Sequence, residues 1–317
     1  MNSTQPQIGR PYASFIVLMS VVNRSGASRY LSSVILAVLF ALGAFGNSAT
    51  FLIMTTQRFR NLSYVNYLIV LSLTDFVICI NFTLMPVLQF ALFNQRVDPI
   101  FLMKSLISCR IYEFVMALAS STSSWLIVTI SLERAAVVFF PFASRSICTP
   151  TFARFTITII TAANALFIYF LPIMSKQHSE RYLGCYYESS NQLQFLTVIV
   201  IYLYIVPLTV IITSNTVIVI RLLFAGSKFV SSDRKTTKSK RTTIMLVTVS
   251  LAFATFTLPS TITTLSPIPF GLKQFLYDIF VQFHVCNYVV NFYVYLLLGR
   301  RIREYFCAKV CCRISDQ

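Results

Sequence analysis

Charged side chains are scarce in this chain. They make up 11% of its 317 residues, against about 25% in an ordinary soluble domain. A soluble protein of this length needs charge over much of its outer surface, so water is excluded as the main solvent. Hydrophobic residues account for 56% of the chain, with 29 Phe and 16 Tyr among them. A lipid bilayer and its interfacial zones accept such a composition.

Histidines and buried acids are also few. The chain has two histidines, His178 and His284, and one carboxylate, Asp75, deep in an apolar run. An intramembrane protease or hydroxylase would need paired carboxylates or clustered histidines, so we expect no enzyme. The chain also lacks an internal repeat or paired broken helices, which many transporters have. A small seven-helix transporter is therefore the weaker alternative.

Seven long apolar runs dominate the sequence. A helix needs about 20 apolar residues to cross a bilayer core of about 30 Å, whereas barrel strands alternate over roughly ten residues. The sequence therefore predicts an all-α membrane protein with seven transmembrane helices. The runs are Tyr30–Gln57, Asn61–Gln95, Phe114–Leu132, Phe155–Ser175, Ser189–Ile220, Thr242–Leu272 and Ile279–Gly299. The predicted organisation is an N-terminal tail over 1–29, the bundle over 30–299, and a cytoplasmic helix and tail over 300–317.

The positive charge is distributed unevenly between the two sides of the predicted bundle. With the C-terminus inside, the inner side holds 17 Lys and Arg and four acids, and the outer side holds nine and five. The positive-inside rule then predicts an extracellular N-terminus, a cytoplasmic C-terminus and, by extension, a multi-pass plasma-membrane protein. Topology accounts for most of the net charge, so no nucleic-acid partner is expected. Two sequons, Asn2 and Asn23, lie in the extracellular tail and are candidate glycosylation sites. Whether the apolar stretch 11–22 is a signal peptide or an interfacial tail stays open.

The segment after the last run has the pattern of an interfacial helix. Ile302, Phe306 and Val310 recur every four residues, and basic side chains occupy the rest of the surface. Such a helix lies along the membrane and interacts with anionic lipids. Cys307, Cys311 and Cys312 lie in the same segment and are either palmitoylation sites or free cytosolic thiols.

Two cysteines fall on the predicted outer side. Cys109 lies at the start of the third run, and Cys185 lies in the loop after the fourth. The extracellular side is oxidising, so these two are predicted to form a disulfide bond.

Short motifs occur in order along six of the seven runs. They are Gly46-Asn47, Leu71 to Asp75, Cys109 with Glu133-Arg134-Ala135 further along, Pro207, Phe253 followed by Pro259, and Asn291-Phe292 with Tyr295. Cys109 lies 25 residues before Arg134. The set resembles the rhodopsin-like (class A) family of G-protein-coupled receptors. The resemblance covers about residues 30 to 312.

The chain departs from the family pattern at several positions. Ala135 stands where the family usually has tyrosine, Phe292 where it has proline, and Thr257 where it has a tryptophan. The only tryptophan is Trp125, in the third run. The lysine nearest to the seventh run, Lys273, lies at its outer start, so a retinal Schiff base is excluded. We expect a divergent receptor.

The resemblance implies a signalling mechanism with a heterotrimeric G protein as partner. In it, Glu133 holds Arg134 at rest, and release of Arg134 on activation lets it receive the G protein. Many members add an acid at the inner end of the sixth helix, but here that end carries Lys240 and Arg241. The family resemblance extends the activation switch to a further set of residues: Phe253, Pro259, Asn291 and Tyr295.

Asp75, the one carboxylate deep in an apolar run, is the predicted cation-binding residue. In the family the matching aspartate binds sodium with polar groups that match Ser123, Asn287 and Asn291, and hard oxygen ligands suit such an ion. The alternative is a protonated Asp75 that is only hydrogen-bonded. Apart from this sodium ion we expect no cofactor.

The residues at the predicted extracellular end of the bundle give little specific information about the ligand. Amine receptors of the family have an aspartate where this chain has Met116, so a monoamine ligand is not expected. Carboxylates and aromatic rings gather there and could bind the basic end of a peptide; with Met116, the candidate ligand-binding residues are Glu113, Tyr112, Glu188 and Asp278. A solvated rim is the alternative. The chain is similar to invertebrate neuropeptide receptors of the FMRFamide-receptor-like kind, and a divergent chemosensory receptor for a non-peptide ligand is the second interpretation.

Overall fold

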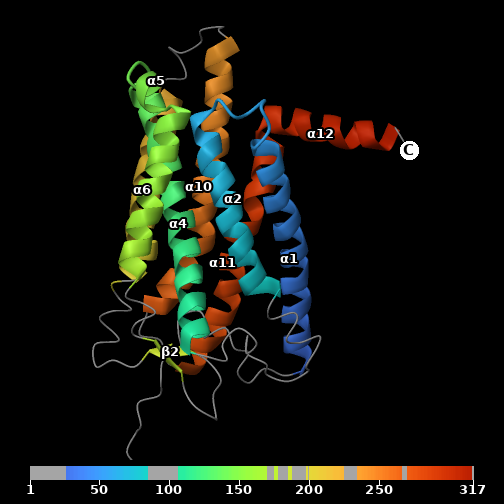
Figure 1. Cartoon of the computed structure of the whole chain (residues 1–317), viewed down its shortest axis with the longest axis vertical. Helices are drawn as coiled ribbons and strands as arrows, with labels where there is room; N and C mark the ends of the chain where they lie inside the picture. Colours follow the sequence, from blue (N-terminus) through green and yellow to red (C-terminus); the bar gives the residue numbers. More distant parts are fainter. Residues whose placement is uncertain are drawn as a thin grey trace, which may run out of the picture.

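The computed structural model is a bundle of long helices with one helix, α12, that projects sideways from one end of the bundle (Figure 1). It describes residues 26–84, 106–169, 175–177, 185–187, 198, 200–224, 234–265 and 270–315. The helices are α1 (Gly26–Met54), α2 (Ser63–Cys79), α4 (Leu106–Phe139), α5 (Ser144–Ile147), α6 (Pro150–Ile168), α9 (Val206–Phe224), α10 (Arg234–Leu265), α11 (Phe270–Leu298) and α12 (Arg300–Ser315). Two π-helical segments, η2 (Ile80–Leu84) and η3 (Ile201–Ile205), extend α2 and precede α9.

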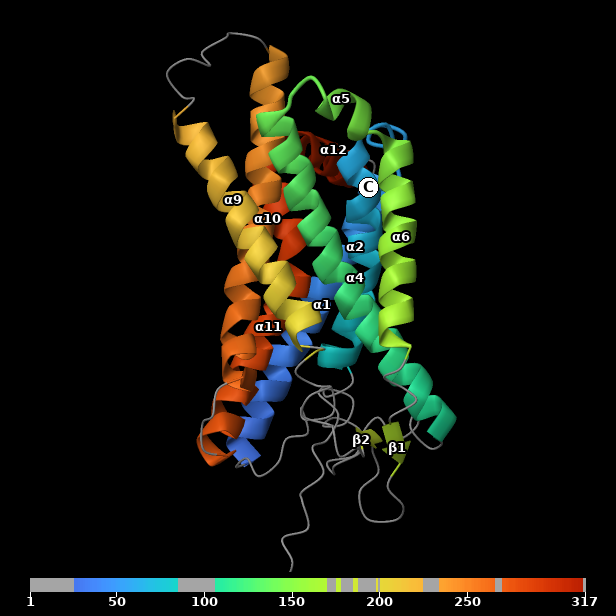
Figure 2. The ribbon, with the colours of Figure 1, turned by 90° about the vertical axis from the view of Figure 1, so that its left-hand side faces the viewer.

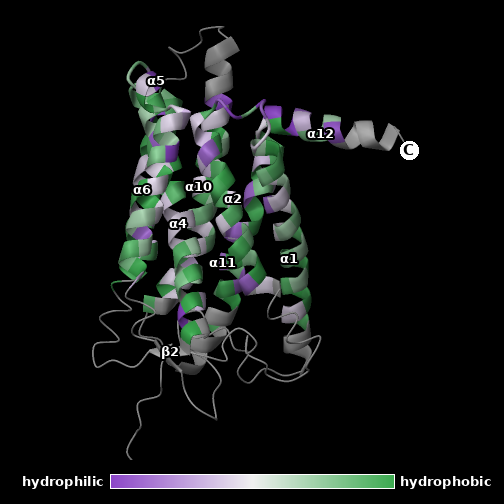
Figure 3. Cartoon of the chain, in the orientation of Figure 1, coloured by the Kyte–Doolittle hydropathy of each residue, from purple (hydrophilic) through white to green (hydrophobic). Residues whose placement is uncertain are grey.

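The helices have the length and composition of transmembrane helices. Six of them in the described chain are long and apolar enough to cross a membrane. The seventh, α2, is shorter but continues directly into η2, since Ile80 keeps helical backbone angles. Large hydrophobic side chains such as Leu31, Leu52 and Leu166 are exposed on the bundle surface, and Figure 3 shows hydrophobic residues along most of the length of the helices. The prediction of an all-α membrane bundle with seven spans and an eighth helix is confirmed.

A short hairpin was not predicted. Strands β1 (Ser175–Gln177) and β2 (Cys185–Tyr187) pair antiparallel, with Ser175 opposite Tyr187. The hairpin lies against α4, at the end of the bundle away from α12 (Figure 2). We call these two ends of the molecule the hairpin end and the α12 end.

Several predicted helix bounds were wrong. The fourth run was expected to remain helical to Ser175, but α6 ends at Ile168 and Ser175 opens β1. The sixth run was expected to begin at Thr242, but α10 already begins at Arg234. Charge limits how much of a helix lies in hydrocarbon and does not stop the helix itself, which explains the longer α10.

Local sequence fixes two of the boundaries. At the start of α6 the Thr149 hydroxyl accepts a hydrogen bond from the Phe152 amide, and Pro150 occupies the first turn, where its missing amide proton costs nothing. Between α11 and α12 the chain turns at Gly299, where an added Cβ would collide with the Tyr295 carbonyl oxygen and lie 2.8 Å from Met245 Sδ. The turn therefore needs glycine, and after it α12 leaves the bundle sideways (Figure 1).

The first part of the predicted apolar stripe on α12 packs against the bundle. Ile302 is buried at 4% exposure. The Phe306 ring contacts the rings of Phe45 and Phe292 edge to face, at centroid distances of 6.5 and 5.7 Å. These apolar contacts attach the first half of α12 to α1 and α11.

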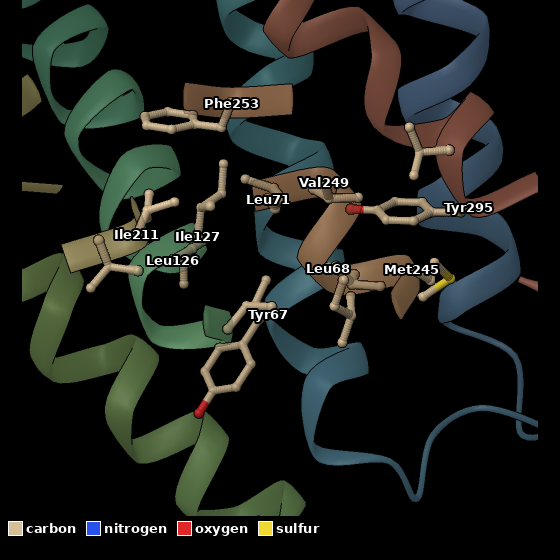
Figure 4. Close-up of a cluster of buried hydrophobic side chains, with 14 of the residues drawn as sticks. Tyr67, Leu68, Leu71, Leu126, Ile127, Ile211, Met245, Val249, Phe253 and Tyr295 are labelled. Atoms are coloured by element: carbon tan, nitrogen blue, oxygen red, sulfur yellow. The ribbon is translucent and has the colours of Figure 1, made fainter. Parts of the chain in front are cut away.

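The largest buried cluster of the described residues joins most of the helices. Figure 4 shows side chains of α2, α4, α9, α10 and α11 meeting there. The labelled residues are Tyr67, Leu68, Leu71, Leu126, Ile127, Ile211, Met245, Val249, Phe253 and Tyr295. This apolar layer separates two buried polar clusters, one around Asp75 and one around Arg134. Along α4 the two are 11 residues apart, from Ser123 to Arg134, or about 16 Å at the rise of a helix.

Candidate functional site

Asp75 lies one turn before the end of α2 and is completely buried. The Ser123 hydroxyl of α4 donates a hydrogen bond to Asp75 Oδ1 at 2.7 Å, and Asn291 Nδ2 of α11 donates to Oδ2 at 2.7 Å. A buried carboxyl group is costly unless hydrogen bonds or a cation compensate for lost hydration. Asp75 thus joins three helices through one side chain.

More amide groups lie close to this centre. Asn287 and Asn291 are buried on α11, and within the described part of the chain the Asn287 side chain and Asn291 Oδ1 have no hydrogen-bond partner. On the α1 side, Asn47 Nδ2 donates to the Tyr288 carbonyl oxygen at 2.9 Å. Asp75, Ser123, Asn287 and Asn291 together offer carboxylate, hydroxyl and amide oxygens. This donor set suits a small hard cation such as sodium.

Glu133 and Arg134 form a buried ion pair at the α12 end of α4. Arg134 Nη2 lies 2.5 Å from Glu133 Oε1, and the two residues are 6% and 9% exposed. A buried pair of this kind is expensive to desolvate, and loss of one partner leaves an uncompensated charge. The two residues that the sequence analysis predicted to pair therefore form an ion pair in the structure.

Two residues of α2 that the sequence analysis did not single out contact this pair. Ser63 Oγ donates to Glu133 Oε2 at 2.8 Å. The Arg134 guanidinium lies over the Tyr64 ring, 5.4 Å from its centroid. Serine and tyrosine at the start of an apolar helix form no recognisable pattern, so nothing in the sequence pointed to them.

A neutral hydrogen bond connects α4 to α10 one turn deeper. Ser131 Oγ lies 2.9 Å from Ser250 Oγ, and both residues are fully buried. Each hydroxyl also contacts a carbonyl one turn back in its own helix. This contact could not be predicted from the sequence, because serines occur on many faces of these helices.

The other predicted switch residues lie in α10 and α11. Phe253 and Tyr295 are each 1% exposed and belong to the central apolar cluster (Figure 4). Pro259 lies inside α10, where it removes one backbone hydrogen bond, and the buried Thr257 stands two residues before it. Among the described residues, Asn291 is the one of these four switch residues whose side chain is hydrogen-bonded to another proposed site residue, Asp75. The Tyr295 hydroxyl finds no partner among the residues that the structure describes.

The predicted ligand-binding residues are only partly described. Tyr112 donates its hydroxyl hydrogen to Asn81 Oδ1, which joins α4 to η2. Met116 is 3% exposed and packs in a second apolar cluster with Val285 and Tyr288. Three predicted carboxylates, Glu113, Glu188 and Asp278, have side chains outside the described part.

His284 is a buried residue of this region to which the sequence analysis gave no role. Its Nε2 lies 3.0 Å from the Tyr288 hydroxyl, and its ring meets the Tyr204 ring edge to face at 5.7 Å. It thereby connects α11 with η3.

The side chains of most residues predicted for the disulfide bond, lipidation and glycosylation lie outside the part of the chain that the structure describes. Cys185 begins β2 and Cys109 lies in α4, and these two elements are in contact, but neither side chain is described. Cys307 is an exposed free thiol on α12. Cys311 and Cys312 belong to the same helix without described side chains, and the glycosylation candidates Asn2 and Asn23 lie outside the described residues.

Comparison with known families gives one match. The family model described as "7 transmembrane receptor (rhodopsin family)" matches residues 46–295, which is most of the chain. The matched range contains Asp75, the Glu133 and Arg134 pair, and Tyr295. No curated protein matches the sequence.

Proposed function

The chain belongs to the rhodopsin family of seven-transmembrane receptors, and we propose that it binds an extracellular ligand and activates a heterotrimeric G protein. The observation that carries the proposal is the buried pair of Glu133 and Arg134 at the α12 end of α4. An ion pair adds little net stability at such a place, so it is better explained as a switch than as a structural support.

The α12 end is proposed to face the cytoplasm. The turn between α1 and α2 carries Arg58 and Arg60, and α10 and α12 carry most of the remaining cations of this end. Figure 3 shows hydrophilic residues along α12 and along the turn beside it. Loops rich in Lys and Arg stay on the cytoplasmic side. In this orientation Arg134 is presented to a cytoplasmic partner, and the hairpin end faces the extracellular ligand.

Activation is proposed to proceed by release of Arg134. In the resting state Glu133 neutralises the guanidinium and keeps it against α2 and α4. A ligand that binds better to the arrangement with Arg134 released shifts the population toward it. The G protein then supplies acceptors that replace Glu133.

Asp75 is proposed to hold a sodium ion in the resting state. Ser123, Asn287 and Asn291 provide the other oxygens, and two amide oxygens of this set lack partners within the described chain. When bound, the ion supplies a positive charge that compensates the buried carboxylate. A protonated Asp75 with the same hydrogen bonds is the competing arrangement.

The ligand is proposed to be a peptide with a basic end, as in FMRFamide-like neuropeptide systems. Glu113, Glu188 and Asp278 are the carboxylates predicted to bind this basic end, and Tyr112 is the predicted aromatic partner. A guanidinium bound between carboxylates and rings gains charge-assisted hydrogen bonds and cation–π contacts.

The proposal is tested by expressing the chain in cells, applying a library of peptides with free and amidated ends, and recording several G-protein pathways. The matched control is Arg134→Met at equal surface expression. We expect at least one peptide to give a response that the variant loses. A response that persists in the variant would contradict activation through Arg134.

A further inference from the structure

The start of α10 has no acid with which to hold Arg134. Residues 234–241 contain five Lys or Arg and no Asp or Glu, and Lys240 and Arg241 are exposed. Cations at this position repel a guanidinium, so a direct ionic contact between α10 and Arg134 is excluded there. Any electrostatic connection between the two must pass through another group.

Tyr64 of α2 lies between them. Its ring faces the Arg134 guanidinium at 5.4 Å from centroid to Cζ. Its hydroxyl interacts with the side chain of Thr242, in the third turn of α10. One side chain thus contacts the arginine of α4 through its face and the end of α10 through its edge.

The neighbouring residue holds the other half of the ion pair. Ser63 Oγ donates to Glu133 Oε2 at 2.8 Å and leaves Oε1 to Arg134. Consecutive residues of α2 therefore fix the carboxylate and the guanidinium separately. The orientation of the buried pair depends on α2 as well as on α4.

We propose that Tyr64 is a positioning residue that couples release of Arg134 to displacement of α10. If α10 moves away, the Thr242 contact is lost, the Tyr64 ring is free to rotate, and Arg134 loses the aromatic face above it. Conversely, while the ring stays in place it keeps Arg134 turned toward Glu133. The inference rests on the proposed G-protein activation and adds to it the link between α10 and Arg134.

The inference predicts two separable effects. Tyr64→Phe keeps the ring and removes only the hydroxyl, so ligand-free signalling rises by the worth of one neutral hydrogen bond, about three- to tenfold. Tyr64→Leu also removes the ring, and loss of a partly buried cation–π contact adds about a further fivefold.

The experiment measures ligand-free G-protein activation at matched surface expression for Tyr64→Phe, Tyr64→Leu, Thr242→Val and the double variant Tyr64→Phe with Thr242→Val. The control is Thr255→Val, an exposed threonine of α10 whose hydroxyl bonds the Leu251 carbonyl of its own helix. Thermal inactivation of each purified variant is recorded in parallel. We expect Tyr64→Phe, Thr242→Val and their double variant to rise alike, Tyr64→Leu to rise further, and the control to match the parent.

Three results would overturn the inference. Additive effects of Tyr64→Phe and Thr242→Val would mean that the two side chains do not act through one bond. Equal signalling by Tyr64→Leu and Tyr64→Phe would mean that the ring does not hold Arg134. Lower thermal stability with unchanged signalling would leave only a structural role. Glu133→Gln distinguishes failure of the inference from failure of the proposed function. If Glu133→Gln raises ligand-free signalling while the Tyr64 variants do not, the inference alone fails. If Glu133→Gln also leaves signalling unchanged, the proposed function fails as well.

Discussion

Replacing Glu133 by Gln removes the negative charge that neutralises Arg134 and preserves the size of the side chain. In the structure Glu133 Oε1 accepts from Arg134 at 2.5 Å and Oε2 accepts from Ser63 at 2.8 Å. Glutamine has only one oxygen acceptor, so it cannot keep both bonds. The substitution therefore weakens a charge-assisted contact and breaks or reverses a second one.

The magnitude follows from the difference between charged and neutral hydrogen bonds. A bond to a charged group is worth about 1.5 to 3 kcal/mol, and a neutral one about 0.5 to 1.5 kcal/mol. Losing about 1 to 1.5 kcal/mol of an interaction made only at rest raises the ratio of active to resting receptor about five- to tenfold. We expect ligand-free signalling to rise by that factor where the active fraction of the parent is small.

The assay is ligand-free second-messenger production, normalised to receptor counted at the cell surface. Glu304→Gln is the matched control, because Glu304 also pairs with an arginine, Arg300 Nε at 2.6 Å, but on the exposed face of α12. The hydrogen bond from Arg300 holds the pKa of Glu304 below its ordinary value, so this acid is ionised at neutral pH. An exposed pair contributes little, so the control stays at the parent level. Unchanged signalling by Glu133→Gln, or an equal rise in both variants, would refute the reasoning.

Three further predictions concern the cation site, the hairpin and the ligand. Sodium chloride should raise the thermal stability of the purified receptor more than choline chloride does, and Asp75→Asn should abolish that difference; an equal effect of both salts on the parent would count against a bound sodium ion. Non-reducing peptide mapping should recover Cys109 linked to Cys185, and a free thiol at either position would exclude the disulfide bond. For an activating peptide with an arginine near its end, Glu113→Gln or Asp278→Asn should lower potency roughly 30-fold, and far less when citrulline replaces that arginine; potency within a few-fold on both variants would leave these carboxylates as rim residues.

The transmembrane spans could be predicted because the bilayer imposes them. Unbroken apolar runs of about 20 residues have few alternatives to a crossing helix, and each of the seven predicted runs overlaps a helix of the structure. Helix ends were harder to predict. The start of α10 at Arg234 and the end of α6 at Ile168 lie where the chain leaves hydrocarbon, and there hydropathy no longer distinguishes helix from loop.

The polar centres were predictable only in part. Asp75, Ser123 and Asn291 were grouped through the family resemblance, and the structure brings them within hydrogen-bonding distance. Tyr64 was not found, because its contact to Arg134 joins α2 to α4 across 70 positions of sequence and depends on how the helices pack. Contacts of that kind carry no periodicity that a single sequence can show.

Activation of a G protein through Arg134 is tested most directly with purified components. Glu133→Gln receptor is reconstituted into lipid vesicles with each class of heterotrimeric G protein, and guanine-nucleotide exchange is measured without ligand. We expect exchange on at least one class to exceed that of the parent about five- to tenfold, and the double variant with Arg134→Met to return it to the level of empty vesicles. Exchange that never exceeds empty vesicles, or that survives loss of Arg134, would contradict this mechanism.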